Sequence, residues 1–250
     1  MPDEALLFQT TGLPWSERAG LDELSAVLSP TGDRRHNLFL HGVHLFAARR
    51  ALGYFREGGT IIDFGCGTGR FTRFFASHNC RVLATEVTAS MLERAKAECT
   101  GSGCDFVLTD GVAVPAPSGS IDGIWCCAVL RYSLFVPNPA YNEIAKEMYR
   151  LLRPGTYVVN CEMYVDKRPE SFVSGFENAG FVTRNVSMLH RYGGKLERLM
   201  CRKLIPEWGI TTIGRTSAFI HAQADNPEQD WEEMRDFLFV WQKPFVEDNG

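Results

Sequence analysis

A glycine-rich turn directly after a short apolar run constrains this chain more than any other feature. Thr60-Ile61-Ile62 is followed by Asp63-Phe64-Gly65-Cys66-Gly67-Thr68-Gly69-Arg70. The apolar run predicts a strand, and three alternating glycines let the backbone turn sharply and approach a ligand closely. The dinucleotide fingerprint requires a glycine where Arg70 stands, and Asp63 would repel a pyrophosphate but attract a cation. The turn therefore favours a cationic ligand over a nicotinamide dinucleotide.

Short β-rich runs alternate with longer helical patterns along the rest of the chain. We expect strands at residues 60–64, 81–86, 105–109, 121–127, 157–161, 181–186 and 217–221. We expect helices at 38–55, 70–77, 89–99, 141–152, 171–178 and 230–241. Strands separated by helices indicate the α/β fold class, with a seven-stranded, mostly parallel sheet covered by helices on both faces. Such sheets bind ligands at the carboxyl ends of their strands, where Glu86 can accept hydrogen bonds from a ribose diol.

Several further motifs occur at consistent places in this pattern. Residues 82–92 read V-L-A-T-E-V-T-A-S-M-L, Asp110-Gly111 is followed by Val114-Pro115, residues 120–124 read S-I-D-G-I, and residues 151–155 read L-L-R-P-G. Ala179-Gly180-Phe181 precedes the sixth expected strand. With the glycine turn, these motifs resemble the class I S-adenosylmethionine-dependent methyltransferases over residues 55–187. The resemblance implies a Rossmann-like sheet whose last strand is antiparallel, and S-adenosylmethionine as the cofactor.

The resemblance also implies which residues hold this cofactor. The backbone of the glycine turn would bind its methionine end, Asp63 would face the positive ammonium and sulfonium region, and Glu86 would accept from the ribose. Asp110 would accept from the adenine amino group, and Cys127 would hold the amino acid moiety through its backbone. The implied cofactor residues are Asp63, Gly65, Cys66, Gly67, Gly69, Glu86, Val87, Met91, Asp110, Gly111 and Cys127. Glu86 stands where the family often has Asp, and Thr156 where it often has Gly.

The residues after the fourth expected strand bear on the acceptor. Many methyltransferases of exocyclic or glutamine amines have [DN]-P-P-[FY] there, whereas this chain has Cys126-Cys127-Ala128-Val129. We therefore expect O-methylation of a small molecule, such as a sugar or a natural-product hydroxyl, by in-line transfer. Arg131 and Tyr132 follow that strand near the expected methyl position. Tyr132 is a candidate catalytic residue and Arg131 a candidate substrate contact, with a packing role for Tyr132 equally open.

The helix expected at 38–55 leads tightly into the first strand, so its beginning should lie at the carboxyl edge of the sheet. His36 is therefore a candidate catalytic residue, with a surface cap as its alternative role, and Arg35 is a candidate substrate contact. His41 and His44 lie one or two turns farther along, where we expect packing. The three histidines share a helix face without a nearby carboxylate, so we expect no metal site.

No linker or repeat divides the 250 residues, so we expect a single methyltransferase domain. Its parts are an N-terminal cap at 1–36, a cofactor-binding core at 37–186, an insertion at 187–215, and a last strand with a C-terminal helix at 216–250. The insertion contains His190 and Tyr192, two further candidate substrate contacts. Its basic residues are typical of a solvated helix, and alternatively of a lid for an anionic acceptor or RNA.

Composition excludes several classes of protein. The formal net charge of −4 gives no general attraction to nucleic acid. No apolar run reaches the ~18–20 residues of a membrane helix, and the N-terminus lacks the basic residues of an export signal, so we expect a cytoplasmic protein. None of the eight cysteines has C-x-x-C spacing, which predicts free thiols in a reducing compartment. The oligomeric state stays open.

Three other functions remain open beside small-molecule methylation. The basic segment at 187–203 suggests an RNA-modifying methyltransferase. The same cofactor residues could serve a non-catalytic binding scaffold. A nicotinamide-dependent oxidoreductase is disfavoured by Asp63 and Arg70. The partner that we expect is a small-molecule acceptor, with no membrane.

Overall fold

The computed structural model describes residues 13–29, 33–131, 140–164, 170–191, 205–223 and 235–245 of the chain. Within these residues a seven-stranded sheet has the order β3-β2-β1-β4-β5-β7-β6. Its strands are β1 (Thr60–Phe64), β2 (Arg81–Glu86), β3 (Asp105–Leu108), β4 (Ile121–Cys127), β5 (Leu152–Tyr164), β6 (Val182–Arg191) and β7 (Arg235–Gln242). β1 to β5 pair in parallel, whereas β7 is antiparallel to both β5 and β6. The expected fold class is confirmed, including the antiparallel last strand.

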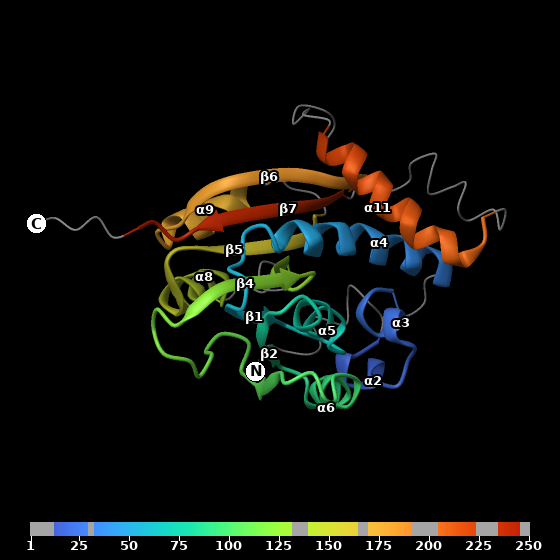
Figure 1. Cartoon of the computed structure of the whole chain (residues 1–250), viewed down its shortest axis with the longest axis horizontal. Helices are drawn as coiled ribbons and strands as arrows, with labels where there is room; N and C mark the ends of the chain where they lie inside the picture. Colours follow the sequence, from blue (N-terminus) through green and yellow to red (C-terminus); the bar gives the residue numbers. More distant parts are fainter. Residues whose placement is uncertain are drawn as a thin grey trace, which may run out of the picture.

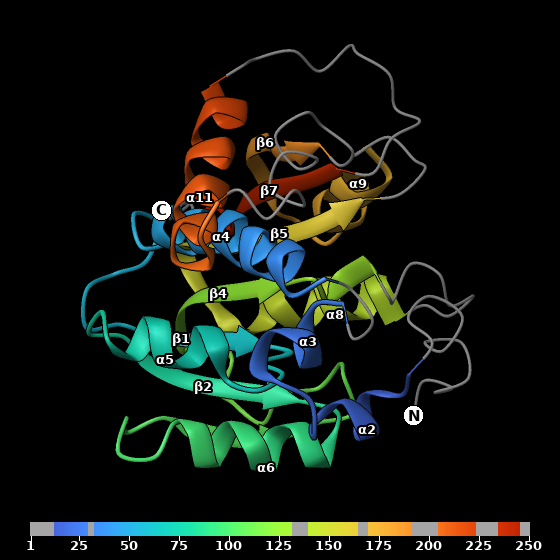
Figure 2. The ribbon, with the colours of Figure 1, turned by 90° about the vertical axis from the view of Figure 1, so that its right-hand side faces the viewer.

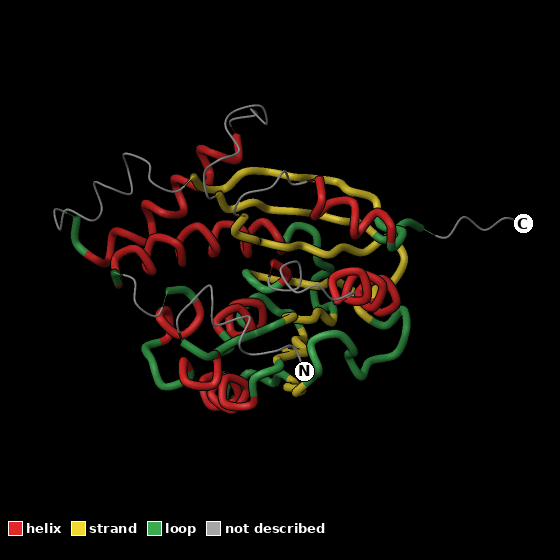
Figure 3. Tube along the Cα trace, turned by 180° about the vertical axis from the view of Figure 1, so that it is seen from behind, coloured by secondary structure: helices red, strands yellow, loops and turns green. Residues whose placement is uncertain are grey.

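Helices cover both faces of this sheet (Figures 1 and 2). They are α2 (Trp15–Arg18), α3 (Glu23–Val27), α4 (Arg34–Ala51), α5 (Arg70–Ala76), α6 (Ala89–Glu98), α8 (Ala140–Leu151), α9 (Glu170–Asn178) and α11 (Glu207–Gln223). α8 and α9 pack on one face through Met148 and Phe176. α4, α5 and α11 pack on the other face through Phe39, Phe75 and Ile210. Seen from behind, the strands form one twisted layer with helices on either side (Figure 3).

None of the helices in the described ranges combines the length and the apolar character that a membrane crossing needs.

The central strands are apolar on both faces, because helices cover both sides of the sheet. Asp122 is the exception within β4, and its buried carboxylate links three strands. One oxygen accepts a hydrogen bond from the backbone N–H of Thr60 at 2.8 Å, and the other pairs with Arg153 at 2.5 Å. Asp122 therefore fastens the amino ends of β1, β4 and β5, at the edge of the sheet opposite the glycine turn.

The segment at 217–221, predicted as the seventh strand, lies inside α11. Close packing between two helices explains this difference. A Cβ on Gly214 would lie 2.2 Å from the carbonyl oxygen of Phe39, and a Cβ on Gly42 would lie 2.2 Å from that of Thr211. Backbone therefore meets backbone where α11 crosses α4, and this contact buries a helix that is weakly patterned in sequence (Figure 1).

The helix predicted at 230–241 is also wrong, because residues 235–242 form β7. Phe237, Phe239 and Trp241 face α8 and α9, whereas Leu238 and Val240 face α4. A strand that is buried on both faces is a continuous apolar run, which periodicity alone does not distinguish from a helix. The part expected at 216–250 as a strand followed by a helix is therefore a helix followed by a strand.

Candidate active site

The turn between β1 and α5 holds its backbone in a conformation that requires glycine. Gly65, Gly67 and Gly69 have φ values of 71°, 56° and 81°. A Cβ on Gly65 would lie 2.5 Å from the side chain of Val129 in the loop after β4. A Cβ on Gly67 would lie 2.9 Å from Val27 in α3. The turn is therefore a backbone cradle, closed on one side by the N-terminal segment and on the other by the loop after β4.

Asp63 stands at the beginning of this turn as a buried carboxylate. Its Oδ2 accepts a hydrogen bond from the hydroxyl of Thr72 at 2.6 Å. Burial raises the pKa of Asp63 to about 7, although the bond from Thr72 opposes the shift. A cation beside a buried carboxyl group with so high a pKa stabilises its ionised form. This environment suits the positively charged end of a ligand.

Glu86 ends β2 and organises the turn through three backbone hydrogen bonds. Its Oε2 accepts from the N–H of Gly67 at 2.9 Å, and its Oε1 accepts from those of Val87 and Thr88, each at 2.9 Å. Burial raises the pKa of Glu86, while these bonds act against the rise. A carboxylate offers roughly four lone-pair sites, so Oε2 keeps one for a ligand hydroxyl. Glu86 thus joins β2 to the turn and still presents an acceptor.

Asp110 lies in an exposed turn after β3. Its Oδ1 accepts from the N–H groups of Val112 and Ala113, each at 2.9 Å, and these bonds lower its pKa. Oδ2 has no protein partner within the described ranges and can accept from an amino group. Gly111 has a φ of 90°, and a Cβ there would lie 3.1 Å from Val87. The carboxylate is therefore held in a fixed orientation beside a glycine that leaves room for a flat ring.

Two apolar residues line the same region. Met91 is buried in α6, and its terminal methyl group would lie 3.8 Å from a Cβ on Gly67. Cys66 is buried within the turn and donates its backbone N–H to the carbonyl of Thr85 at 2.9 Å. Val87, by contrast, is 40% exposed. The structure thus brings the residues predicted from β1, β2, β3 and α6 to one edge of the sheet.

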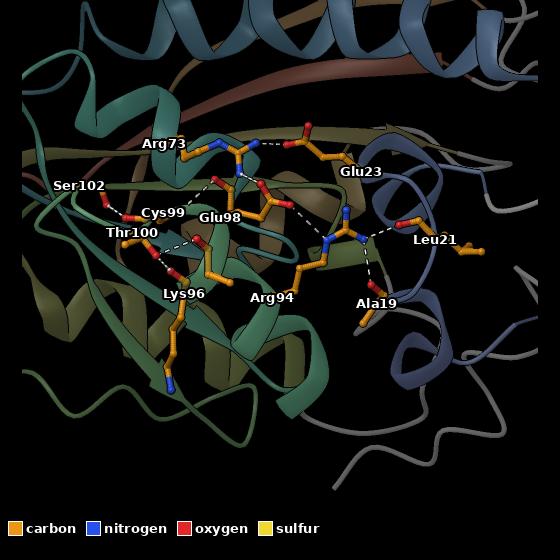
Figure 4. Close-up of polar contacts among 12 residues, drawn as sticks. Ala19, Leu21, Glu23, Arg73, Arg94, Lys96, Glu98, Cys99, Thr100 and Ser102 are labelled. Atoms are coloured by element: carbon orange, nitrogen blue, oxygen red, sulfur yellow. Dashed lines mark hydrogen bonds and ion pairs between the residues drawn. The ribbon is translucent and has the colours of Figure 1, made fainter.

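The segment formed by α2 and α3 is fastened to α6 by arginine contacts. Arg94 donates to the carbonyl oxygens of Ala19 and Leu21 at 2.9 Å and 2.5 Å (Figure 4). Arg73, on α5, forms an ion pair with Glu23 in α3. Figure 4 shows both arginines reaching across from α5 and α6 to this segment. The contacts hold α3 over the glycine turn.

Glu162 at the carboxyl end of β5 is a site residue that the sequence analysis did not single out. It is buried, and its Oε2 accepts from the backbone N–H groups of Val129 and Arg131 at 3.1 Å and 3.3 Å. Burial raises the pKa of Glu162 to about 8, against the nearby charge of Arg131. Glu162 therefore secures the loop whose Val129 covers Gly65. Glu162 is the one acid of β5, and this was the available signal.

The predicted acceptor-side residues lie in varied surroundings. Arg35 is buried, and its guanidinium donates to the carbonyl of Ile205, so it joins α4 to the residues before α11. His190 is also buried, with its ring centroid 4.7 Å from that of Phe39. His36 is half-buried in the first turn of α4. Tyr132 and Tyr192 lie outside the described residues, as does the segment 192–204.

His41 and His44 are nearer to the glycine turn than we expected. Arg70 follows Gly69 directly and donates to Nδ1 of His41 at 2.9 Å and to Nδ1 of His44 at 3.3 Å. Because α4 and α5 share one face of the sheet, the middle of α4 meets the beginning of α5. Burial and the charge of Arg70 lower the pKa of His41 to about 3. These histidines are therefore polar partners of Arg70 as well as packing residues.

Comparison with known proteins agrees with this geometry. Residues 61–155 match the family model described as a methyltransferase domain. The malonyl-[acyl-carrier protein] O-methyltransferase of Enterobacter lignolyticus (strain SCF1) is 27% identical over 115 residues, which cover 46% of this chain and 43% of the relative. The demethylmenaquinone methyltransferase of Lactococcus lactis subsp. lactis (strain IL1403) is 33% identical over 112 residues, 42% of each chain. The matches thus span under half the length of these curated relatives.

This chain contains a class I S-adenosylmethionine-dependent methyltransferase domain. Among solved structures, geranyl diphosphate methyltransferase in complex with SAM has a TM-score of 0.57 at 16% sequence identity. That likeness covers 85% of this chain and 92% of the other, and it is a likeness of fold.

The methyltransferase domain offers groups that suit its cofactor, S-adenosylmethionine. The cradle at Gly65 and Gly67 has no room for a Cβ. Asp63 is a buried carboxyl group that a cation would stabilise, and Oδ2 of Asp110 is oriented to accept from an adenine amino group. Oε2 of Glu86 keeps a lone pair for a ribose hydroxyl. These five residues are therefore compatible with the group in charge and in hydrogen-bonding capacity.

Proposed function

We propose that this methyltransferase domain transfers the methyl group of S-adenosylmethionine to an oxygen atom of a small-molecule acceptor. The observation that carries this proposal is the end of β4. Cys126 to Val129 offer no carboxylate or amide side chain to hold an amine, and the N–H of Val129 is taken up by Glu162. Val129 itself forms an apolar wall against Gly65. One curated relative is named as an O-methyltransferase, which supports the same choice.

The cofactor supplies a methyl group that is already activated by its sulfonium, so the protein has to align the reactants and exclude water. Asp63 balances the positive charge, and Glu86 and Asp110 orient the nucleoside. Val27 and Val129 cover the glycine turn from two sides and keep water from it. A hydroxyl acceptor also needs a group that takes its proton, for which His36 and Tyr132 are the proposed residues.

The first experiment is calorimetric titration of the whole chain with S-adenosylhomocysteine, with NADH as the control ligand. We expect binding of S-adenosylhomocysteine alone. Binding of NADH only would overturn the cofactor assignment, and binding of neither would favour a degenerate site.

Acceptor chemistry is then tested with labelled S-adenosylmethionine and acceptors that carry a hydroxyl, a carboxylate, an amine or a thiol on one scaffold. We expect label on oxygen. Transfer to amines alone would refute O-methylation while leaving the cofactor assignment in place. An arm with structured RNA tests the alternative acceptor, since RNA binding should weaken steeply as salt is raised.

A further inference from the structure

Side chains from three elements meet at the carboxyl ends of β4 and β5. His44 comes from α4, Cys127 ends β4, and Cys161 is the register partner of Cys127 on β5. One donor atom of each residue, a ring nitrogen and two sulfurs, lie within 4.8 Å of one another. His44 and Cys161 are buried, Cys127 is partly exposed, and both cysteines are free. The cluster thus places two sulfurs close together, one on a half-buried residue and one on a buried residue.

Arg70 decides which nitrogen of His44 carries the ring proton. A guanidinium only donates hydrogen bonds, and Nη2 of Arg70 lies 3.3 Å from Nδ1 of His44, so Nδ1 must be the acceptor. The proton of the neutral ring is therefore on Nε2. The ring N–H on Nε2 can then donate to a sulfur of the cluster, whose donor atoms lie within 4.8 Å of one another. This arrangement favours the anionic form of Cys127.

The charge of Arg70 acts in the same direction, whereas the neighbouring acids oppose a thiolate. Burial opposes a thiolate, but the hydrogen bonds from Cys161 and His44 and the charge of Arg70 hold the pKa of Cys127 well below its usual value. Hydrogen bonding to Cys127 and burial together raise the pKa of Cys161. The acids Asp63, Glu162 and Asp236 also face these cysteines. Low-pKa cysteines beside cations are the ones that react with oxidants.

The same three donors are a set that a thiophilic metal ion accepts, but Arg70 makes that occupant unfavourable. A neutral ring that binds a metal through Nε2 carries its proton on Nδ1. That proton would then point at an N–H of Arg70. A metal on Nδ1 would displace Arg70 itself. We therefore propose that Cys127 is a thiolate that reacts with hydroperoxides, and that Cys161 then closes a disulfide with it.

The two steps balance with a hydroperoxide as the oxidant. The sulfur of Cys127 attacks one oxygen, an S–O bond forms as the O–O bond breaks, and the departing oxygen takes up from solvent the proton that the Cys127 thiol released when it ionised. Cys127 is then a sulfenic acid, oxidised by two electrons, while the peroxide is reduced to water or an alcohol. Cys161 gives up its proton and attacks this sulfur, so that the S–S bond forms and the S–O bond breaks. Water leaves with the proton of Cys161.

The register of the two strands places the two cysteines side by side, at a Cα separation compatible with a disulfide. Neighbouring strands lie ~4.8 Å apart, within the Cα separation of about 4.4–6.8 Å that disulfides span. Ala128, directly after Cys127, has a φ of 57°, and its N–H donates to the carbonyl of Cys161 at 2.9 Å. Val129 follows and covers Gly65. If the proposed function holds, oxidation removes a negative charge beside the cationic end of the cofactor and constrains this loop, so cofactor affinity should fall.

The experiment treats the reduced, full-length chain with hydrogen peroxide and follows each cysteine by peptide mass spectrometry with dimedone as the trap. We expect a Cys127–Cys161 disulfide in the unaltered protein and a dimedone adduct on Cys127 in Cys161→Ala. His44→Ala should slow the oxidation of Cys127 roughly tenfold, because the thiolate loses a donor. Cys104→Ala is the matched control, since Cys104 lies outside the cluster and should not affect Cys127.

A second measurement needs no variant, so it stands even if a substitution prevents folding. Alkylation of Cys127 by iodoacetamide should keep its rate as the pH falls below the pKa of an ordinary thiol, whereas alkylation of free cysteine in the same solution should slow. An equal slowing of Cys127 and free cysteine would overturn the proposal, and so would stoichiometric Zn²⁺ binding that blocks alkylation of Cys127. Titration with S-adenosylmethionine before and after oxidation tests the coupling, and unchanged affinity would refute that part alone. These thiol readouts do not depend on methyl transfer.

Discussion

Three carboxylates of the site differ in how far the protein itself satisfies them. Glu86 accepts three backbone hydrogen bonds and Asp110 accepts two, so both are held in place before any ligand arrives. Asp63 is buried and accepts one short hydrogen bond from Thr72. The three acids therefore differ in how many hydrogen bonds the protein donates to them, and Asp63 is the one that a cation would stabilise most.

The raised pKa of Asp63 predicts how ligand affinity depends on pH. A cationic ligand stabilises the ionised carboxylate, so binding is strongest above the pKa of about 7, where Asp63 is already charged. Below that pKa the proton has to leave first, and affinity should fall up to about tenfold per pH unit. Titrations with S-adenosylhomocysteine across this range measure the effect. Asp63→Asn should bind weakly with a flat profile, and a flat profile in the unaltered protein would contradict the prediction.

Two glycines with similar backbone angles allow the cost of backbone strain to be measured apart from the cost of steric crowding. Gly65 has a φ of 71° and Gly58 a φ of 66°, but a Cβ on Gly58 meets nothing within 4 Å. Both alanine variants should lose about 1–2 kcal/mol of unfolding free energy from backbone strain. Gly65→Ala should lose more, because its Cβ would lie 2.5 Å from Val129, and it should also lose cofactor affinity. Denaturant unfolding and calorimetry measure both quantities, and equal losses in the two variants would refute the crowding argument.

At the scale of elements, the position of α4 depends on its crossing with α11. Gly42 and Gly214 let the two helix backbones touch, and His41 and His44 then meet Arg70 on the other side of α4. Glycine inside a helix costs conformational entropy, so a close helix contact must offset that cost. The crossing is thus a packing device that also sets the distance between α4 and the glycine turn.

The crossing predicts opposite effects for two glycines of the same helix. Gly214→Ala should reduce the unfolding free energy by roughly 1–3 kcal/mol, because the Cβ would collide with the carbonyl of Phe39. Gly209→Ala is the control, since its Cβ would make an ordinary contact at 3.7 Å with Ile205. That variant should be neutral or gain up to about 1 kcal/mol from helix propensity. Thermal and denaturant unfolding measure both variants. An unchanged unfolding free energy in Gly214→Ala would show that the helices can move apart without cost.

At the scale of the whole molecule, an early and a central part of the chain close one site together. The segment of α2 and α3 precedes the sheet in sequence, yet it lies on α6 and over the glycine turn (Figures 2 and 4). Its two helices are short, so they depend on these contacts instead of on their own stability. Arg94 is the main fastening, because one side chain satisfies two carbonyl groups.

Removing that fastening should loosen the N-terminal segment without unfolding the sheet. Arg94→Ala should make residues 13–28 more sensitive to limited cleavage by chymotrypsin and weaken cofactor binding. Lys96→Ala is the matched control, since Lys96 lies on the same helix and pairs at the surface with Glu93. It should change neither quantity, because an exposed ion pair contributes little. Identical cleavage patterns in the two variants would contradict the role of Arg94.

The elements that the sequence predicted well are those whose signals are local. Positive φ at the glycine turn and the short apolar runs of β1, β2 and β4 depend on neighbouring residues, so their bounds agree closely with prediction. The same holds for the placement of Asp63, Glu86 and Asp110 at one edge, because parallel strands align their carboxyl ends.

Other features depend on contacts between segments that are far apart in the chain. β7 was predicted as a helix because both its faces are buried, and α11 was mistaken in part for a strand because its contact with α4 rests on glycines. The meeting of Arg70 with His44, and of His44 with Cys127 and Cys161, joins two helices and two strands. No spacing in the sequence encodes such a cluster, since side chains become neighbours only when the helices pack on the sheet. Local backbone preferences therefore made the glycine turn predictable from the sequence, whereas the packing of helices on the sheet alone created the thiol cluster.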